Sequence, residues 1–155
     1  MTTAAGKIRA LFGKNLSRGT AAIEFAIGAP VLMILLVGLV EVGFAAYQSM
    51  QVQNAVEAGV MYATQNGWDS AGISAAVTNA TGAGGMTASP APAQFCGCPG
   101  AGSITAFTCT ATCPDGTSPG QYVQVNATLA RISIFPGSGL TLPVNLTATS
   151  TVRIQ

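Results

Sequence analysis

The sequence predicts an α+β fold: a long N-terminal membrane-spanning helix, a short second helix and a small C-terminal antiparallel β-sheet cross-linked by disulfides. Three observations support it. The residues from Phe25 to Val40 carry no charge, two C-terminal stretches alternate apolar and polar residues, and four cysteines lie together between these regions. Only 7% of the residues are charged, against about 25% in a typical soluble domain.

The charges are distributed unevenly along the chain. The net charge is only +1, but the first nineteen residues hold four basic side chains and no acid: Lys7, Arg9, Lys14 and Arg18. Because basic flanks stay on the cytoplasmic side, we expect residues 1–19 to be a cytoplasmic leader and the C-terminal domain to be exported. A short basic leader is not the basic face of a folded domain, so the composition argues against nucleic-acid binding.

One long helix is expected over residues 20–66, spanning a membrane over about 21–47. The charge-free run falls short of the roughly 20 residues that span a bilayer, so the span must extend past Glu41, which would reach headgroups or water at its far end. Beyond it, apolar residues recur at three- and four-residue spacing, with Gln48 on the polar side. Pro30 should kink or loosen the apolar part, and Gly67 should stop the helix.

Residues 67–95 read as a short helix capped by Asp69 or Ser70, followed by a Gly/Ala linker. Residues 96–155 read as a cysteine-containing loop and an antiparallel sheet. Residues 122–129 and 144–155 alternate with a period of two, residues 103–110 are a weaker strand candidate, and residues 135–139 carry turn chemistry. About three strands against the second half of the long helix is the economical arrangement.

The four cysteines have the spacing C-x-C-x10-C-x3-C: Cys96, Cys98, Cys109 and Cys113. Four cysteines allow three pairings, and a Cys96–Cys98 bridge would be strained, so two bridges across the loop are expected. A zinc site is the alternative, although neither spacing is the usual C-x2-C. Export to an oxidising compartment favours disulfides over a metal.

Catalytic residue patterns are missing from the sequence. The sequence has no histidine, which excludes Ser–His and Cys–His catalytic pairs and metal sites with histidine ligands. Asp69 and Asp115, the only acids beyond the long helix, lie in turn-like contexts. We therefore expect no enzyme activity, no catalytic residues, no cofactor and no metal.

Residues 18–25 have the sequence Arg-Gly-Thr-Ala-Ala-Ile-Glu-Phe, so that the carboxylate of Glu24 directly precedes the apolar run. A Gly followed five residues later by Glu-Phe and an apolar helix resembles the processing site of prepilins. Residues 18–63 resemble TadE-type minor pilins of tight-adherence (Tad/Flp) pili, and the order of elements further on is similar more loosely. The cysteine-containing segment matches no family pattern.

This resemblance implies a function, a location and a set of partners. A prepilin peptidase would cut after Gly19, so that Thr20 becomes the N-terminus and Glu24 and Phe25 the fifth and sixth mature residues. Glu24 would face the α-amino group of a neighbouring subunit and set the register of assembly, because opposite charges neutralise each other in an apolar fibre. The protein would be a structural component of the pilus in the bacterial inner membrane, with its domain periplasmic or extracellular. Other pilins and Tad assembly proteins would be its partners, with a connection to cell adhesion.

Two alternatives stay open at this point. The chain could be a secreted, disulfide-cross-linked binding module that signal peptidase releases near Ala45, since small residues follow the apolar run. It could also be a simple single-pass membrane-anchored protein, in which Glu24 only marks the membrane interface.

Overall fold

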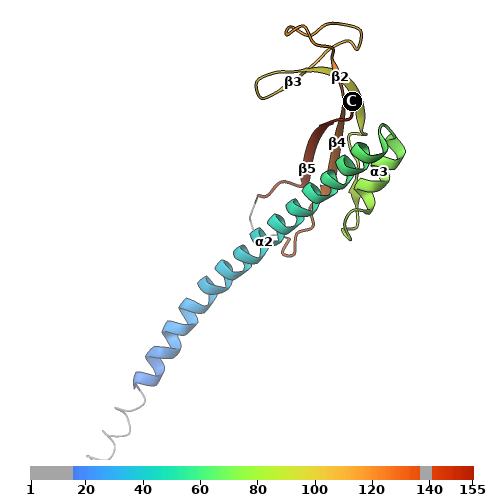
Figure 1. Ribbon diagram of the computed structural model, residues 1–155. Helices are drawn as coiled ribbons and strands as arrows, with labels where there is room; N and C mark the ends of the chain where they lie inside the picture. Colours follow the sequence, from blue (N-terminus) through green and yellow to red (C-terminus); the bar gives the residue numbers. More distant parts are fainter. Residues whose placement is uncertain (1–15, 137–140) are drawn as a thin grey trace, which may run out of the picture. The chain divides into compact units, whose positions relative to one another are not determined.

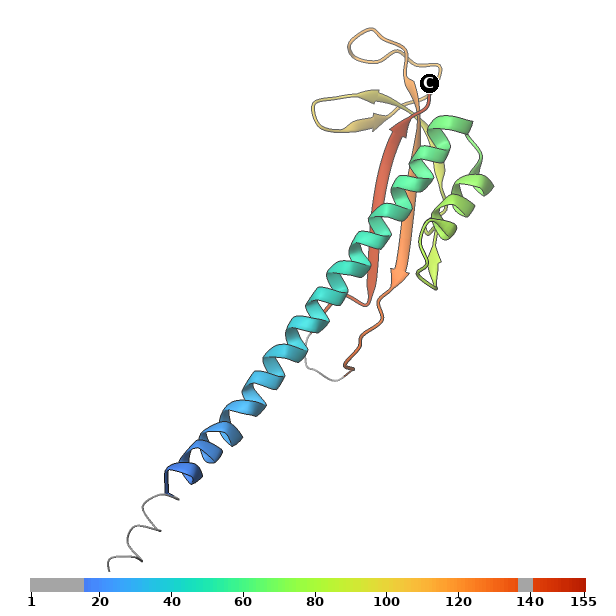
Figure 2. The same ribbon diagram turned by 60° about the horizontal axis from the view of Figure 1, so that its bottom comes forward.

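The computed structural model describes residues 16–136 and 141–155. The basic residues Lys7, Arg9 and Lys14 of the expected leader lie outside this range, as does most of the turn expected at 135–139. The described chain forms two helices and five strands (Figures 1 and 2): α2 Leu16–Asn66, α3 Ser70–Asn79, β1 Met86–Thr87, β2 Ala93–Pro99, β3 Ile104–Ala106, β4 Gly120–Ala130 and β5 Asn145–Arg153. The expected α+β fold class is confirmed.

The long helix α2 is continuous through Pro30 and ends at Asn66, where the sequence predicted its end. Gly67 adopts φ +76°, a conformation that favours glycine, and its N–H donates to the Ala63 carbonyl at 2.9 Å, which terminates the helix. Residues 16–19 are also helical, ahead of the expected start at residue 20, so the described helix includes the whole of the predicted processing segment.

Contacts divide the chain into two compact units. One holds the helix as far as Val42 together with Phe135 and Pro136, and the other holds residues 43–134 and 141–155. The second unit contains the C-terminal part of α2, helix α3 and the whole sheet. Its core lies between these helices and one face of the sheet, and consists of Val52, Ala55, Val56, Ala63, Ile73, Val77, Met86, Val123, Val125, Ala127 and Leu129.

Strand β4 is the centre of the sheet. It pairs with β5 over residues 122–130 on one edge, while β2 and the short β1 pair with successive parts of its other edge. Strand β3 extends β2 as a hairpin, and all the pairings are antiparallel. The odd-numbered residues of β4 from 123 to 129 face the core, as the alternation predicted.

The sheet has five strands rather than the three expected. The Gly/Ala linker expected within residues 67–95 contains β1 and the first three residues of β2. The expected cysteine loop is also partly strand, because Cys96 and Cys98 lie in β2. Strand β2 was not predicted from the sequence, because it lacks a clear alternation of apolar and polar residues: Ala-Gln-Phe-Cys-Gly-Cys-Pro.

Candidate membrane-anchoring and processing segment

The N-terminal half of α2 exposes apolar side chains on every side. Phe25, Ile27 and Leu39 are each at least two-thirds exposed, and Ala29, Val37 and Gly38 are among the few residues that are partly covered. A helix that is apolar all round needs an apolar surrounding. Residues 19–66 make up the one helix in the described part of the chain that is long and apolar enough to cross a membrane, and its most apolar window is unburied.

The four residues of the predicted processing site lie close together at the start of this helix. Gly19, Thr20, Glu24 and Phe25 are all exposed, and a side chain at Gly19 would meet no atom within 4 Å. The Gly19–Thr20 bond lies close to the N-terminal limit of the described part of α2.

Glu41 lies at the other end of the apolar run, and its side chain is far less exposed than expected. The sequence placed it in contact with headgroups or water, but its side chain is only 1% exposed. One carboxylate oxygen, Oε2, accepts a hydrogen bond from the Phe135 backbone N–H at 3.3 Å. A buried carboxylate is costly unless hydrogen bonds replace its water, and the segment after β4 supplies this bond. That segment is remote in sequence, so helical periodicity could not reveal the contact.

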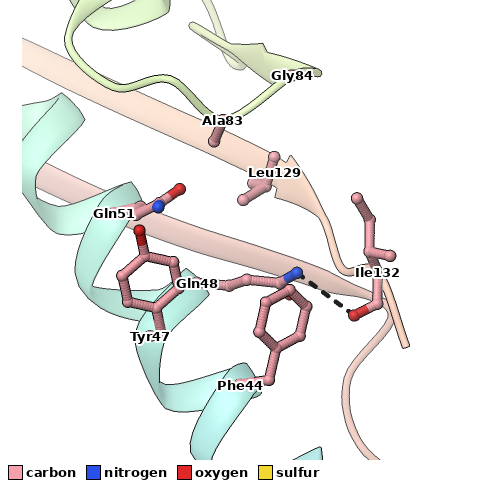
Figure 3. A pocket seen from close by; sticks show the side chains of 8 residues that line it. All are labelled: Phe44, Tyr47, Gln48, Gln51, Ala83, Gly84, Leu129 and Ile132. Carbon is pink, nitrogen blue, oxygen red and sulfur yellow. Dashed lines mark hydrogen bonds between the residues drawn. The ribbon is translucent and has the colours of Figure 1, made fainter. Parts of the chain in front are cut away.

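Gln48, two turns further along the helix, was also predicted to be on the polar side and is 4% exposed. Its Nε2 donates to the Ile132 carbonyl at 3.3 Å, again in the segment after β4. Figure 3 shows Gln48 beside a cavity of about 180 Å³, which Phe44, Tyr47 and Gln51 border from α2 and Leu129 and Ile132 border from the other side. The walls are mainly apolar, and Tyr47 is half exposed.

Two disulfides connect the strands and loops at the far end of the sheet. Cys96 pairs with Cys109 and Cys98 with Cys113, with Cα–Cα distances of 5.1 and 5.7 Å. The expectation of two bridges is confirmed, and the pairing is settled between the two arrangements that the sequence left open. All four thiols are consumed in disulfides, so none of them is free to bind zinc in this structure.

The corner between α2 and α3 is held by Asp69. Its carboxylate caps α3 by accepting from the Ala71 N–H at 3.1 Å, and it also accepts from the Tyr62 hydroxyl at 3.1 Å. The Gly72 N–H, followed by the Tyr62 hydroxyl, holds the pKa of Asp69 below its usual value. The same hydroxyl–carboxylate bond raises the pKa of Tyr62. Both shifts follow from hydrogen bonds that favour the ionised carboxylate.

The described chain therefore has one N-terminal helix able to span a membrane, which continues into a small disulfide-bonded α+β domain. These features define its structural class. Residues 19–71 match the family of TadE-like proteins, which confirms the resemblance drawn from residues 18–63. The matched segment contains all four predicted processing residues and ends at the start of α3, before the cysteines and the sheet. No curated protein and no solved structure matches the chain.

Proposed function

We propose that this chain is a minor pilin of a Tad/Flp-type pilus, cut by a prepilin peptidase after Gly19 and anchored in the bacterial inner membrane. The TadE-like match and the apolar N-terminal helix fit a component of a Tad pilus. The observation that carries the finer proposal is Glu24: a carboxylate five residues after Gly19, exposed on an otherwise apolar helix surface within the matched segment.

The role of Glu24 follows from its surroundings. An exposed carboxylate next to apolar side chains is costly once lipid or other helices cover them, so a positive partner must compensate it. Cleavage after Gly19 would create such a partner, the α-amino group of Thr20, on every subunit. Pairing between Glu24 of one subunit and Thr20 of its neighbour would fix the axial register of the fibre.

The TadE-like family is structural and non-enzymatic, and we propose a structural role for this chain too. The partners would be the prepilin peptidase, other pilin subunits and the inner-membrane proteins of the Tad assembly machinery. The basic leader would remain in the cytoplasm, and the disulfide-bonded domain would lie in the periplasm or outside the cell, where disulfides form.

N-terminal sequencing of the mature protein, recovered from membranes of cells that carry a Tad system, tests the processing step. We expect the sequence to begin at Thr20. The Gly19→Leu variant should stay uncut, because the added side chain blocks close approach to the backbone. Gly28→Leu is the matched control, since a side chain there also meets nothing within 4 Å, and it should be cut normally. A mature protein beginning near Ala46 would identify the secreted alternative, and an uncut wild-type chain would identify a simple anchor.

Electron microscopy of piliated cells tests the role of Glu24. The Glu24→Ala variant should still insert into the membrane, because the change only raises hydrophobicity, but pilus assembly should fail or become sparse. Glu57→Ala is the control, since Glu57 is an exposed glutamate of the same helix that lies beyond the apolar run. Normal pili in the Glu24→Ala strain would show that this glutamate does not set the register.

A further inference from the structure

A second cavity lies among the disulfide-bonded strands and loops, which Figures 1 and 2 show together at one end of the sheet. It has a volume of about 290 Å³ and is bordered mainly by Cys98, Pro99, Thr105, Phe107, Pro114 and Asp115. All of these residues belong to one compact unit, and all lie beyond the segment that matches the TadE-like family. We call it the loop cavity, and it is large enough for several water molecules or for one side chain.

The two sides of the loop cavity are held together by a covalent bond and by a hydrogen bond. The Cys98–Cys113 disulfide connects strand β2 to the segment that carries Pro114 and Asp115. Within that segment, the Cys113 N–H donates to the Thr117 carbonyl at 2.9 Å. A site fixed in this way loses little conformational freedom when a ligand binds, so less of the binding free energy is spent on ordering it.

Asp115 supplies the one charge that borders the loop cavity, and it is the only charged residue between positions 70 and 130. Its Oδ1 accepts hydrogen bonds from the Thr117 hydroxyl at 2.7 Å and from the Thr117 N–H at 3.0 Å. The hydroxyl, followed by the N–H, holds the pKa of Asp115 below its usual value, and no neighbouring charge contributes. The carboxylate is therefore ionised at neutral pH. Its Oδ2 accepts no hydrogen bond from another residue in the part of the chain that the structure describes.

The charge and the walls of the loop cavity together favour one kind of ligand. The carboxylate attracts a cation, the prolines favour an apolar stem beside it, and the Phe107 ring can attract the cation as well. A guanidinium group binds a carboxylate best through both oxygens, but Oδ1 already accepts two hydrogen bonds. A compact ammonium group needs only one oxygen, so a lysine side chain fits this site better than an arginine side chain.

We propose that the loop cavity binds a lysine side chain of a partner protein, with its alkyl stem against Phe107, Pro99 and Pro114 and its ammonium group on Oδ2 of Asp115. Both prolines are exposed, so a side chain of another protein can enter while the backbone that carries it stays outside. The inference goes beyond the proposed pilus role and does not depend on it, because every residue of the cavity lies in the disulfide-bonded domain.

Amide chemical shifts of the full chain in a nonionic detergent test this site. The probe is the peptide acetyl-Gly-Lys-Gly-amide, and its matched control carries norleucine, which has the same stem without the ammonium group. We expect the lysine peptide to shift the amides of Thr105, Phe107 and Asp115, with half-saturation at roughly 1 mM because a single side chain makes the contact. The norleucine peptide should cause no saturable shift.

Three variants identify the groups that bind the probe. Asp115→Asn removes the charge but keeps an oxygen that can accept the Thr117 hydrogen bonds, and it should bind the lysine peptide about tenfold more weakly. Phe107→Leu keeps an apolar wall without the aromatic ring, and should weaken binding about two- to five-fold. Asp69→Asn is the control, since Asp69 is another exposed, hydrogen-bonded carboxylate that lies outside the cavity, and it should bind as wild type does. Unchanged β4 amide shifts in each variant verify that the domain is folded.

Several results would overturn the inference. These are the absence of shifts at the three amides, equal binding of the norleucine peptide, and unchanged binding by Asp115→Asn. An arginine peptide that binds as tightly as the lysine peptide would refute the preference for an ammonium group. Spermidine tests for a free amine: we expect its affinity to lie within about tenfold of that of the lysine peptide. Much tighter binding of spermidine would assign the cavity to free polyamines instead of a protein.

Discussion

Gly59 provides the sharpest test of how the C-terminal part of the long helix packs on the sheet and on α3. A Cβ at this position would come within 2.7 Å of methyl carbons of both Val125 in β4 and Val77 in α3. Ordinary contacts begin at 3.4 Å, so each methyl would have to retreat by about 0.7 Å. Both valines are fully buried and β-branched, which leaves them little freedom to move.

The Gly59→Ala variant therefore combines two opposing effects. Overpacking a well-filled core costs about 1–3 kcal/mol. Replacing a glycine inside a helix by alanine stabilises it by roughly 0.5–1 kcal/mol, because the unfolded chain loses conformational freedom. We expect the first effect to be larger, with a net loss of about 1 kcal/mol in the free energy of unfolding.

Urea unfolding of the full chain in mild detergent, followed by Trp68 emission, measures this loss. A double-mutant cycle with Val77→Ala isolates the clash, because the second change removes one of the two obstructing methyl groups. Val77→Ala should be less destabilising in the Gly59→Ala background than alone, by about 1 kcal/mol. If Gly59→Ala is as stable as wild type and the two changes are simply additive, the close approach of helix and sheet is wrong.

Two further predictions concern the disulfides and the helix corner. Replacing Cys98 and Cys113 by serine removes a bridge between residues 15 apart, and should lower the free energy of unfolding by about 3 kcal/mol in the same urea assay; an unchanged midpoint would show that the bridge adds no stability. The lowered pKa of Asp69 means that its ionised form stabilises the folded chain. That contribution is complete above the ordinary pKa of 3.8 and is lost as the pH falls through the lower folded-state value. Thermal unfolding followed by Trp68 should therefore be more acid-sensitive below about pH 4 in wild type than in Asp69→Asn, and parallel pH profiles would contradict the assignment.

Local signals in the sequence were sufficient to predict the C-terminal end of the long helix, the start of the short helix and the two longest strands. Gly67 ended the first helix, Asp69 capped the second, and the period-two alternation found β4 and β5. Each of these signals acts within a few residues, so it can be read without knowledge of the partner. The processing residues Gly19 and Glu24 were found in the same way, from their spacing in the chain, and their proposed roles remain predictions.

Contacts between remote segments could not be predicted in this way. Glu41 and Gln48 looked solvent-facing because their hydrogen-bonding partners, Phe135 and Ile132, lie more than eighty residues away. Strand β1 was missed because two residues carry no periodicity, and it exists only through its pairing with β4. In each case the residue or strand depends on a partner that the sequence alone does not identify.

The distance along the chain between α2 and its partners β4 and β5 affects how the domain folds during synthesis. The apolar face of α2, with Val52 and Val56, is made early, but its partners Val123 and Val125 follow about seventy residues later. Strand β5 pairs with the other edge of β4 and follows it in the chain. At synthesis rates of about 5–20 residues per second, this apolar face stays uncovered for several seconds. The apolar face of α2 can therefore be covered only after β4 and β5 have been made, and deletion of β5 would remove one edge of the sheet.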